Sequence, residues 1–398
     1  MYDPSYCPKL RAIEVVPFTY QGQQRLLLRD PFGYTEGAFM LPASLAPILS
    51  LMDGSNTLRD IQAAASRLYG RLVMLEEVNQ LVASLDESLF LDNERFQALR
   101  QRLEEEFRSS PVRLPSHADK AYPGDPEKLR EFLDQILAQS EHQRAENPTR
   151  AVIAPHIDLT CGARGFAAAY RRAYFPEGAR IIVLGTGHFL ESVLSVLPKD
   201  FATPLGLAYT DREFIAALEE RVGPEVRGHE WGHRVEHSIE FQVIFLRYLL
   251  GDRFRLVPVL CGGLETITEK DQTLLENFIT ALRELVDEET YFVAGVDFCH
   301  LGVRYGDLVP AGEREKEQAL RYDRKLLERI LAIDPQGFYE LIMRVENRYR
   351  VCGFTPLYVL LRLLEGRPLR GEILHQEAVD FGPGSIVSFA AAVLYDQA

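Results

Sequence analysis

Five residues with metal-binding or acid–base side chains stand directly beside apolar stretches of the chain. His156 ends the run AVIAPH, and His188 ends the run IIVLGTGH. Asp297 and His300 follow a third apolar run, and Cys352 precedes a segment of helical pattern. Imidazole combined with thiolate or carboxylate is the chemistry of transition-metal sites. One such histidine is usually structural, whereas several that converge on one cleft indicate a functional site.

A second cluster, HEWGH at 229–233, matches the HExxH signature of zinc proteases. That signature needs one continuous helix so that His229 and His233 share a face, with Glu230 as the general base. Pro224 lies just upstream and Gly232 lies inside the motif, and both disfavour a helix. We therefore expect a histidine-rich loop here, and a zinc hydrolase is the least favoured hypothesis.

His237 opens another segment of helical pattern, with Glu240 about one turn further along. An imidazole at the start of a helix can face a cleft, which makes His237 a candidate catalytic residue. Helix capping explains the same pair equally well.

The segments that must position these residues alternate between strand and helix patterns beyond residue 150. This alternation predicts an α/β fold with a parallel or mixed sheet flanked by helices. We expect strands at 151–154, 180–184, 194–197, 255–260, 291–296 and 386–392. We expect helices at 165–174, 211–221, 238–250, 269–285, 313–330, 336–345 and 356–364. Ligands bind beyond the carboxyl ends of strands in such sheets, where His156, His188 and Asp297 would lie.

The first hundred residues show a different pattern of apolar residues. A short strand at 25–29 precedes three segments with apolar residues at helical spacing, at 45–52, 58–68 and 75–85. This pattern predicts a small winged-helix-like domain over 1–110, ending in a charged helix. Four prolines in the stretch that follows indicate a linker and a helix over 111–147, and the α/β domain would then span 148–398.

Composition excludes several classes of protein. The 398 residues carry a formal net charge of −14, and residues 1–110 contain 15 acidic and 11 basic side chains. Such a surface repels phosphate backbones, so we expect no nucleic acid partner. The five cysteines are scattered without a CxxC pair, which favours a reducing compartment. Because neither a signal peptide nor a membrane-spanning apolar run is present in the sequence, we expect a cytoplasmic protein that does not enter a membrane.

Five motifs in this order, APH, LGTGH, EHSIE, DFCH and CGFTP, resemble the Memo family, whose bacterial and archaeal members are called AmmeMemoRadiSam system protein B. The resemblance covers the chain from about residue 150 onward. It implies a fold similar to class III extradiol dioxygenases of the LigB type. It also implies metal ligands at His156, His188 and Cys352 with Asp297 close by, and His300 falls where such a site has its acid/base histidine. The first hundred residues resemble PqqD-like peptide-binding winged helices.

The resemblance further implies a cofactor and partners. Two imidazoles and a thiolate suit Fe(II) or copper, and Zn(II) also fits. The first hypothesis is therefore a metal-dependent oxidoreductase with dioxygenase-like chemistry on a small molecule or protein group. The alternative is a non-catalytic adaptor that binds a metal or a peptide. A radical SAM enzyme and an Ammecr-domain protein are the expected partners.

Overall fold

The six strands predicted beyond residue 150 form a mixed sheet together with two strands that were not predicted. Its strands are β5 (Thr149–Ala154), β6 (Ala179–Thr186), β7 (Leu194–Val196), β10 (Phe254–Cys261), β11 (Thr290–Gly295), β12 (His300–Gly302), β13 (Leu369–Asp380) and β14 (Ser385–Asp396). Their order in space is β12-β14-β5-β11-β6-β10-β7, with β13 paired to β14. The central strands β5, β11, β6 and β10 run parallel, and the outer strands run antiparallel to their neighbours. The computed structural model that shows this describes residues 2–265 and 267–397.

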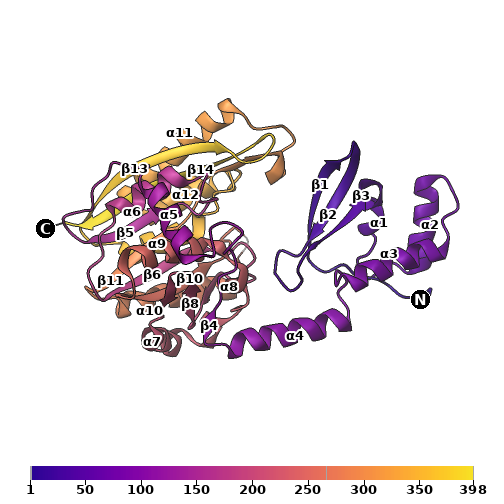
Figure 1. Cartoon of the computed structure of the whole chain (residues 1–398), viewed down its shortest axis with the longest axis horizontal. Helices are drawn as coiled ribbons and strands as arrows, with labels where there is room; N and C mark the ends of the chain where they lie inside the picture. Colours follow the sequence, from indigo (N-terminus) through magenta and orange to yellow (C-terminus); the bar gives the residue numbers. More distant parts are fainter. Residues whose placement is uncertain (1, 266, 398) are drawn as a thin grey trace. The chain divides into compact units, whose positions relative to one another are not determined.

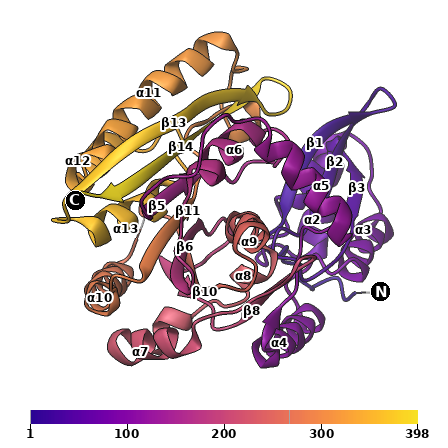
Figure 2. The same cartoon turned by 60° about the vertical axis from the view of Figure 1, so that its left-hand side comes forward.

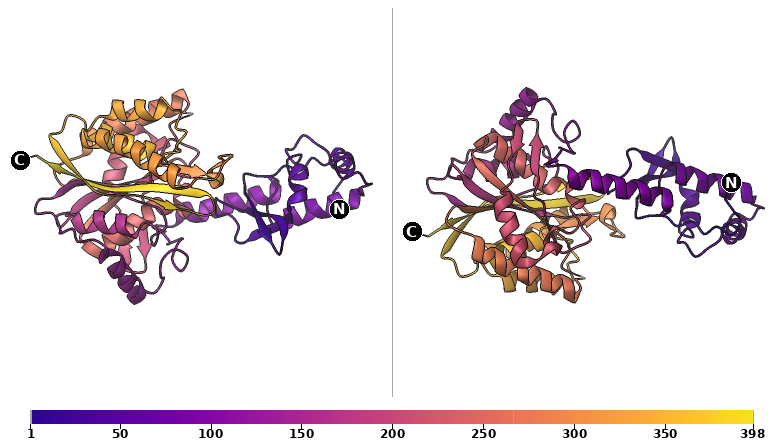
Figure 3. Two further views of the ribbon diagram at one scale, coloured as in Figure 1. Left: turned by 90° about the horizontal axis from the view of Figure 1, so that it is seen from above. Right: turned by 90° about the horizontal axis from the view of Figure 1, so that it is seen from below.

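Helices cover both faces of this sheet, which confirms the predicted α/β class (Figure 1). One face carries α6 (Ala163–Arg172) and α9 (His237–Leu250), with α5 (Pro126–Leu137) packed on α6. The other carries α11 (Glu313–Leu331) and α13 (Phe354–Leu364), backed by α7 (Arg212–Val222), α10 (Glu269–Leu285) and α12 (Pro335–Met343). Figure 2 and the left view of Figure 3 show the sheet between these two layers. Every residue of β5 and of β11 is buried, as expected for parallel strands covered on both faces.

A small second sheet pairs a strand near residue 112 with two strands near residues 200 to 208. It consists of β4 (Val112–Arg113), β8 (Asp200–Thr203) and β9 (Gly206–Ala208), in that order. Arg113 is completely buried. The chain divides into two units at Ser109/Ser110, so the stretch 111–147 that we expected to contain a linker is packed into the second unit.

The first unit, Met1–Ser109, has its own core. Its elements are β1 (Glu14–Tyr20), β2 (Gln23–Arg29), β3 (Ala38–Pro42), α1 (Ala46–Leu49), α2 (Leu58–Tyr69), α3 (Leu75–Glu87) and α4 (Glu94–Ser109). The three strands form an antiparallel meander. Thr57 caps α2, and the Asp60 side chain accepts a hydrogen bond from the Thr57 backbone in return, which closes a capping box. The winged-helix likeness stays a prediction.

Several elements differ from the predicted ones. The short strands β4, β8, β9 and β12, of two to four residues each, were not predicted. The strand β13 was not predicted, because its twelve residues mix polar and apolar side chains and most are only partly buried. The segment at 45–52 forms only the four-residue helix α1, preceded by a 3-10 turn. In the described ranges, no helix is long and apolar enough to cross a membrane.

Candidate metal centre

Three adjacent parallel strands deliver the first group of candidate residues to one edge of the sheet. His156 follows β5, Asp297 follows β11 and His188 follows β6. Gly295 of β11 pairs with Ala154 on one side and Gly185 on the other, so the three strands end at the same level. The ring centroids of His156 and His188 lie 5.1 Å apart.

Cys352 reaches the same place from the loop that precedes α13. Its Sγ lies 3.4 Å from Nε2 of His156 and 3.5 Å from the carbonyl oxygen of Asp297. The close approach depends on Gly353, where a Cβ atom would lie 2.7 Å from Cβ of Val296 and 2.8 Å from the carbonyl oxygen of Asp297. The loop is further anchored by the Thr186 hydroxyl, which donates to the Cys352 carbonyl at 3.0 Å.

The turn before Cys352 is an unusual backbone segment. Glu346, Asn347 and Arg350 all have positive φ, a region that non-glycine residues rarely adopt. The Asn347 side chain accepts a hydrogen bond from the Val351 N–H, and its carbonyl accepts one from the Arg350 N–H. Such strain persists where surrounding contacts over-determine it, and it is concentrated at functional sites.

The donor atoms of His156, His188 and Cys352 all lie within 4.8 Å of one another. Each imidazole ring is oriented by a contact of its Nδ1 atom with an acceptor of the protein. Nδ1 of His156 lies 2.8 Å from the Gly295 carbonyl, and Nδ1 of His188 lies 3.0 Å from the Glu236 carboxylate. Because both partners are acceptors, Nδ1 keeps its hydrogen in each ring, and Nε2 becomes the acceptor that can bind a metal once the ring loses its second proton. This is the arrangement that protein metal sites use to fix a histidine ligand.

Glu236 is a site residue that the sequence analysis missed. It is 3% exposed and caps α9 by accepting from the backbone N–H groups of His237 and Ser238. The same carboxylate accepts from the His188 backbone N–H and ring. The capping role considered for Glu240 therefore belongs to Glu236. Its position two residues before the helix predicted at 238–250 was the available signal.

The charges of the site favour ionised side chains. Burial disfavours the thiolate, but the imidazoles of His156 and His300 outweigh burial and lower the pKa of Cys352 to about 5. Burial also disfavours the His156 imidazolium, but the carboxylate of Asp297 and the thiolate of Cys352 raise its pKa to about 9. A thiolate is the form of cysteine that binds a metal.

Asp297 and His300 border the same cluster, and their donor atoms form a second close group with Cys352. One Asp297 oxygen accepts from the His156 backbone N–H at 3.0 Å, and the other lies 3.6 Å from Nε2 of His156. Nδ1 of His300 lies 3.1 Å from the carbonyls of Phe298 and Arg350, so Nδ1 carries the hydrogen and Nε2 is the group free to exchange a proton.

His237 lies at the rim of the cluster. Its ring stacks on His188 with centroids 5.0 Å apart, and its donor atom groups with those of His188 and Glu236. Burial lowers its pKa to about 4, and the Glu236 carboxylate offsets only part of that effect. His237 is therefore a neutral imidazole at neutral pH.

The HEWGH segment does not form a zinc-protease site. His229 has φ of 61° and lies outside α8 (Gly232–Val235), which is only four residues long. Nε2 of the buried His233 lies 3.1 Å from the Ser195 carbonyl, and Glu230 pairs with Arg227. Among the described residues, none of the three belongs to a cluster of potential metal ligands. His229, Glu230 and Trp231 form the expected turn, whereas Gly232 and His233 lie in the short helix α8. The zinc-hydrolase hypothesis loses its geometric basis.

Glu240 holds the segment from Arg113 to Tyr122 against the start of α9. The buried carboxylate accepts from the guanidinium of Arg113, the Ser116 hydroxyl, the His117 backbone and the Tyr122 hydroxyl. The His117 ring thereby lies 5.6 Å from that of His237. The sequence signal for this contact with Glu240 was the presence of an arginine, a histidine and a tyrosine within ten residues of one another in the stretch that we expected to contain a linker.

Taken together, the fold and this cluster define an α/β protein with a candidate metal centre at the carboxyl ends of its parallel strands. Residues 113–393 match the model of the family described as Memo-like protein, so the chain belongs to the Memo family.

Relatives share different parts of the chain. A MEMO1 family protein of Aquifex aeolicus is 30% identical over 396 residues, covering 98% of this chain and all of the relative. One of Thermus thermophilus is 29% identical, covering 81% of this chain and 94% of the relative. One of Methanopyrus kandleri is 30% identical over 260 residues, covering 61% of this chain and 83% of the relative.

Proposed function

We propose that the second unit binds one transition-metal ion through His156, His188 and Cys352 and carries out redox chemistry there on a small molecule. The observation that carries the proposal is the convergence of these three donors within 4.8 Å, from two strand ends and one helix start. Asp297 is either a fourth ligand or the partner that orients His156.

The donor set fits a soft or borderline metal. Imidazole and thiolate suit Fe(II), Cu(I) or Zn(II), whereas Mg²⁺ and Ca²⁺ prefer oxygen ligands. The second ring nitrogen of each histidine is already bonded within the protein, which leaves Nε2 for the metal. A redox-active metal with open positions would supply binding and electron transfer for O₂ or a bidentate substrate, as in dioxygenase-like chemistry.

His300 is the residue that moves a proton in this proposal. Its Nδ1 is held by two backbone carbonyls, which fixes the ring while Nε2 remains available. Histidine is the side chain that proteins use most often as a general acid or base. The neighbouring Tyr305 ring contacts His300 edge to face at 5.0 Å and limits its rotation.

The family-implied partners, a radical SAM enzyme and an Ammecr-domain protein, belong to the same proposal. Co-purification of either one with the full chain would support that part. The metal assignment does not depend on it.

Metal content measured by plasma mass spectrometry tests the ligand assignment. His156→Ala, His188→Ala and Cys352→Ala should each lose most of the metal, while the matched controls His229→Ala and His233→Ala keep it. Full retention in both His188→Ala and Cys352→Ala would refute the assignment.

Oxygen uptake by anaerobically loaded protein tests the chemistry. The Fe(II)-loaded and Cu(I)-loaded proteins are mixed with catechols and related diols, and O₂ consumption is followed. We expect His300→Ala to keep its metal and to lose most O₂-dependent turnover. If His300→Ala loses metal, it is a ligand. If the parent protein consumes no O₂ with either metal, the adaptor hypothesis replaces the enzyme.

A further inference from the structure

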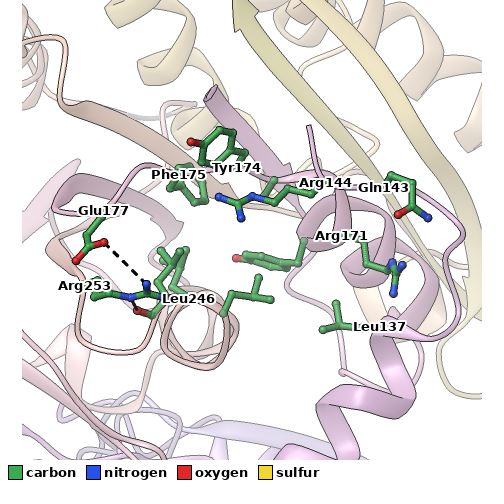
Figure 4. A pocket seen from close by; sticks show the side chains of 13 residues that line it. Leu137, Gln143, Arg144, Arg171, Tyr174, Phe175, Glu177, Leu246 and Arg253 are labelled. Atoms are coloured by element: carbon green, nitrogen blue, oxygen red, sulfur yellow. Dashed lines mark hydrogen bonds and ion pairs between the residues drawn. The ribbon is translucent and has the colours of Figure 1, made fainter. Parts of the chain in front are cut away.

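A cavity of about 520 Å³ lies at the edge of the sheet opposite the metal centre. Figure 4 shows the side chains that line it. The metal-site residues follow the carboxyl ends of β5, β6 and β11. The cavity is lined by residues at the ends of α5, α6 and α9 and by residues that precede the starts of β5, β6 and β10. Its volume falls within the range of about 300–1,000 Å³ that is typical of small-molecule sites.

The floor of the cavity is apolar. Leu137, Leu246 and Phe175 are buried there, and Leu249 lies at the edge with 37% exposure. The hydroxyl of the buried Tyr170 donates to Gln242 at 2.7 Å, so this tyrosine offers the cavity its ring and not a polar group. Such a floor favours the apolar body of a ligand.

The rim of the cavity is cationic. Arg144, Arg171 and Arg253 line it, together with a single acid, Glu177. Glu177 lies 4.0 Å from Arg253, and both groups are exposed, so that pair is weak. The Arg144 guanidinium lies 4.0 Å over the ring of Tyr174 and has no carboxylate partner in the part of the chain that the structure describes. In Figure 4, Arg253 and Arg171 lie on opposite sides of the cavity, with Arg144 between them.

The sign of the local charge is positive even after all contributions are counted. Helices α5, α6 and α9 all end at this cavity, and each carboxyl end contributes roughly half a negative charge. Three guanidinium groups outweigh Glu177 and the three helix ends by roughly half a unit charge. In a chain whose net charge is −14, this excess marks a site for an anion.

We propose that this cavity binds an amphipathic carboxylate, with its apolar body on the leucine floor and its carboxylate on Arg144. Guanidinium groups pair with carboxylates through two parallel hydrogen bonds, and Arg144 has no carboxylate partner among the described residues that would compete with the ligand. The Tyr174 ring holds the Arg144 guanidinium in place before the ligand arrives, which reduces the entropy lost on binding.

Titration calorimetry on the full chain with three matched probes tests this proposal. Octanoate should bind, octanol should bind about tenfold or more weakly, and octylammonium should not bind, because only the head group differs among them. Arg144→Gln should weaken octanoate binding by about tenfold or more, as expected for a lost hydrogen bond to a charged group. Leu249→Glu should weaken it as well, because it adds a negative charge at the edge.

Arg324→Gln, an exposed change on α11 far from the cavity lining, is the matched control and should bind octanoate like the parent. A thermal melt of each variant shows that it is folded. Equal affinity for octanol and octanoate, tighter binding of octylammonium, or full octanoate affinity in folded Arg144→Gln would each overturn the proposal. No detectable octanoate binding by the parent chain would overturn it as well.

Discussion

Glu236 is the residue that organises the imidazoles of the metal centre. One buried carboxylate accepts from His188, from the His237 backbone and from the Ser238 backbone. A carboxylate that bonds the second nitrogen of a metal-bound histidine fixes its tautomer and raises its basicity. Glu236 therefore links the start of α9 to the geometry of His188.

Replacing Glu236 by glutamine tests this role. The amide keeps the shape of the side chain but removes its charge, so metal affinity should fall by about 10- to 100-fold, the usual cost of losing such a partner. The measurement is competition for metal against a chelator of known affinity. Glu230→Gln, in the neighbouring HEWGH segment, is the control and should leave affinity unchanged. Equal affinity of the Glu236→Gln and parent proteins would contradict this role.

Asp323 lies behind the site and has a different character. It is fully buried, and the Cys299 thiol donates to it at 3.0 Å. Burial raises the pKa of Asp323 to about 7, and the bond from Cys299 offsets part of that rise. The folded protein holds this proton up to about pH 7, whereas the unfolded chain releases it near pH 4. The contribution of Asp323 to stability is therefore complete below about pH 4 and decreases as the pH rises to about 7.

The Asp323→Asn variant should lack this pH dependence. As the pH rises from 4 to 7, the unfolding free energy of the parent should decrease relative to that of the variant by up to about 1.4 kcal/mol per pH unit. Urea unfolding of metal-free protein, followed by the fluorescence of Trp231, the single tryptophan, measures it. The exposed change Asp252→Asn is the control. A difference that does not vary with pH would show that Asp323 is already ionised in the folded protein.

At the scale of elements, the loop before α13 decides whether Cys352 can reach the cluster. Its closest contact is at Gly353, whose φ of −73° is ordinary, so space and not backbone conformation requires glycine here. A methyl group at this position would meet the backbone of Asp297 and the side chain of Val296. The loop would have to move away from β11.

Gly353→Ala should therefore lose metal and destabilise the second unit by about 1–3 kcal/mol, the usual cost of overpacking a close contact. Metal analysis and a urea unfolding curve measure the two effects. Gly312→Ala is the matched control, because the nearest atom to its added Cβ is 3.9 Å away. Full metal content in Gly353→Ala would show that the loop has room to adjust.

The same elements show what the sequence could and could not predict. The strand ends at His156, His188 and Asp297 could be predicted because apolar runs report burial on both faces of a parallel strand. The unpredicted strand β13 lacks that signal. The pair of Arg113 and Glu240 could not be predicted, because 127 positions separate them and no local pattern records such a contact. The capping role of Glu236 follows from a local sequence pattern and could have been predicted. The neighbouring histidines His233 and His237 are stronger candidates by residue type, which is why Glu236 was missed.

At the scale of the whole molecule, charge sets a limit on partners. The net charge is −14, and residues 1–110 alone carry a net charge of −4. A protein that binds DNA must replace the counterions of several phosphates with basic side chains. We therefore expect the full chain to show no mobility shift of a random DNA duplex at low salt, where such binding is strongest. A lysine-rich peptide is the positive control, and a salt-sensitive shift by the full chain would contradict the expectation.

The division of the chain at Ser109/Ser110 leads to the last prediction. Every candidate ligand lies in the second unit, and the Methanopyrus kandleri relative matches only 61% of this chain over 83% of its own length. A fragment that spans Ser110–Ala398 should therefore fold and bind metal with the stoichiometry of the full chain. Circular dichroism, urea unfolding and metal analysis measure this.

A fragment that begins at Asp125 keeps the helix α5 and the whole large sheet but lacks Arg113, His117 and Tyr122. The Glu240 carboxylate would then be buried without its guanidinium partner, a change that usually costs about 3–5 kcal/mol. We expect this shorter fragment to unfold at lower urea concentration and to hold metal less tightly, because Glu240 lies on α9, whose capping residue Glu236 orients His188. Equal stability of the two fragments would show that residues 110–124 are a linker after all, as the prolines of this stretch first indicated.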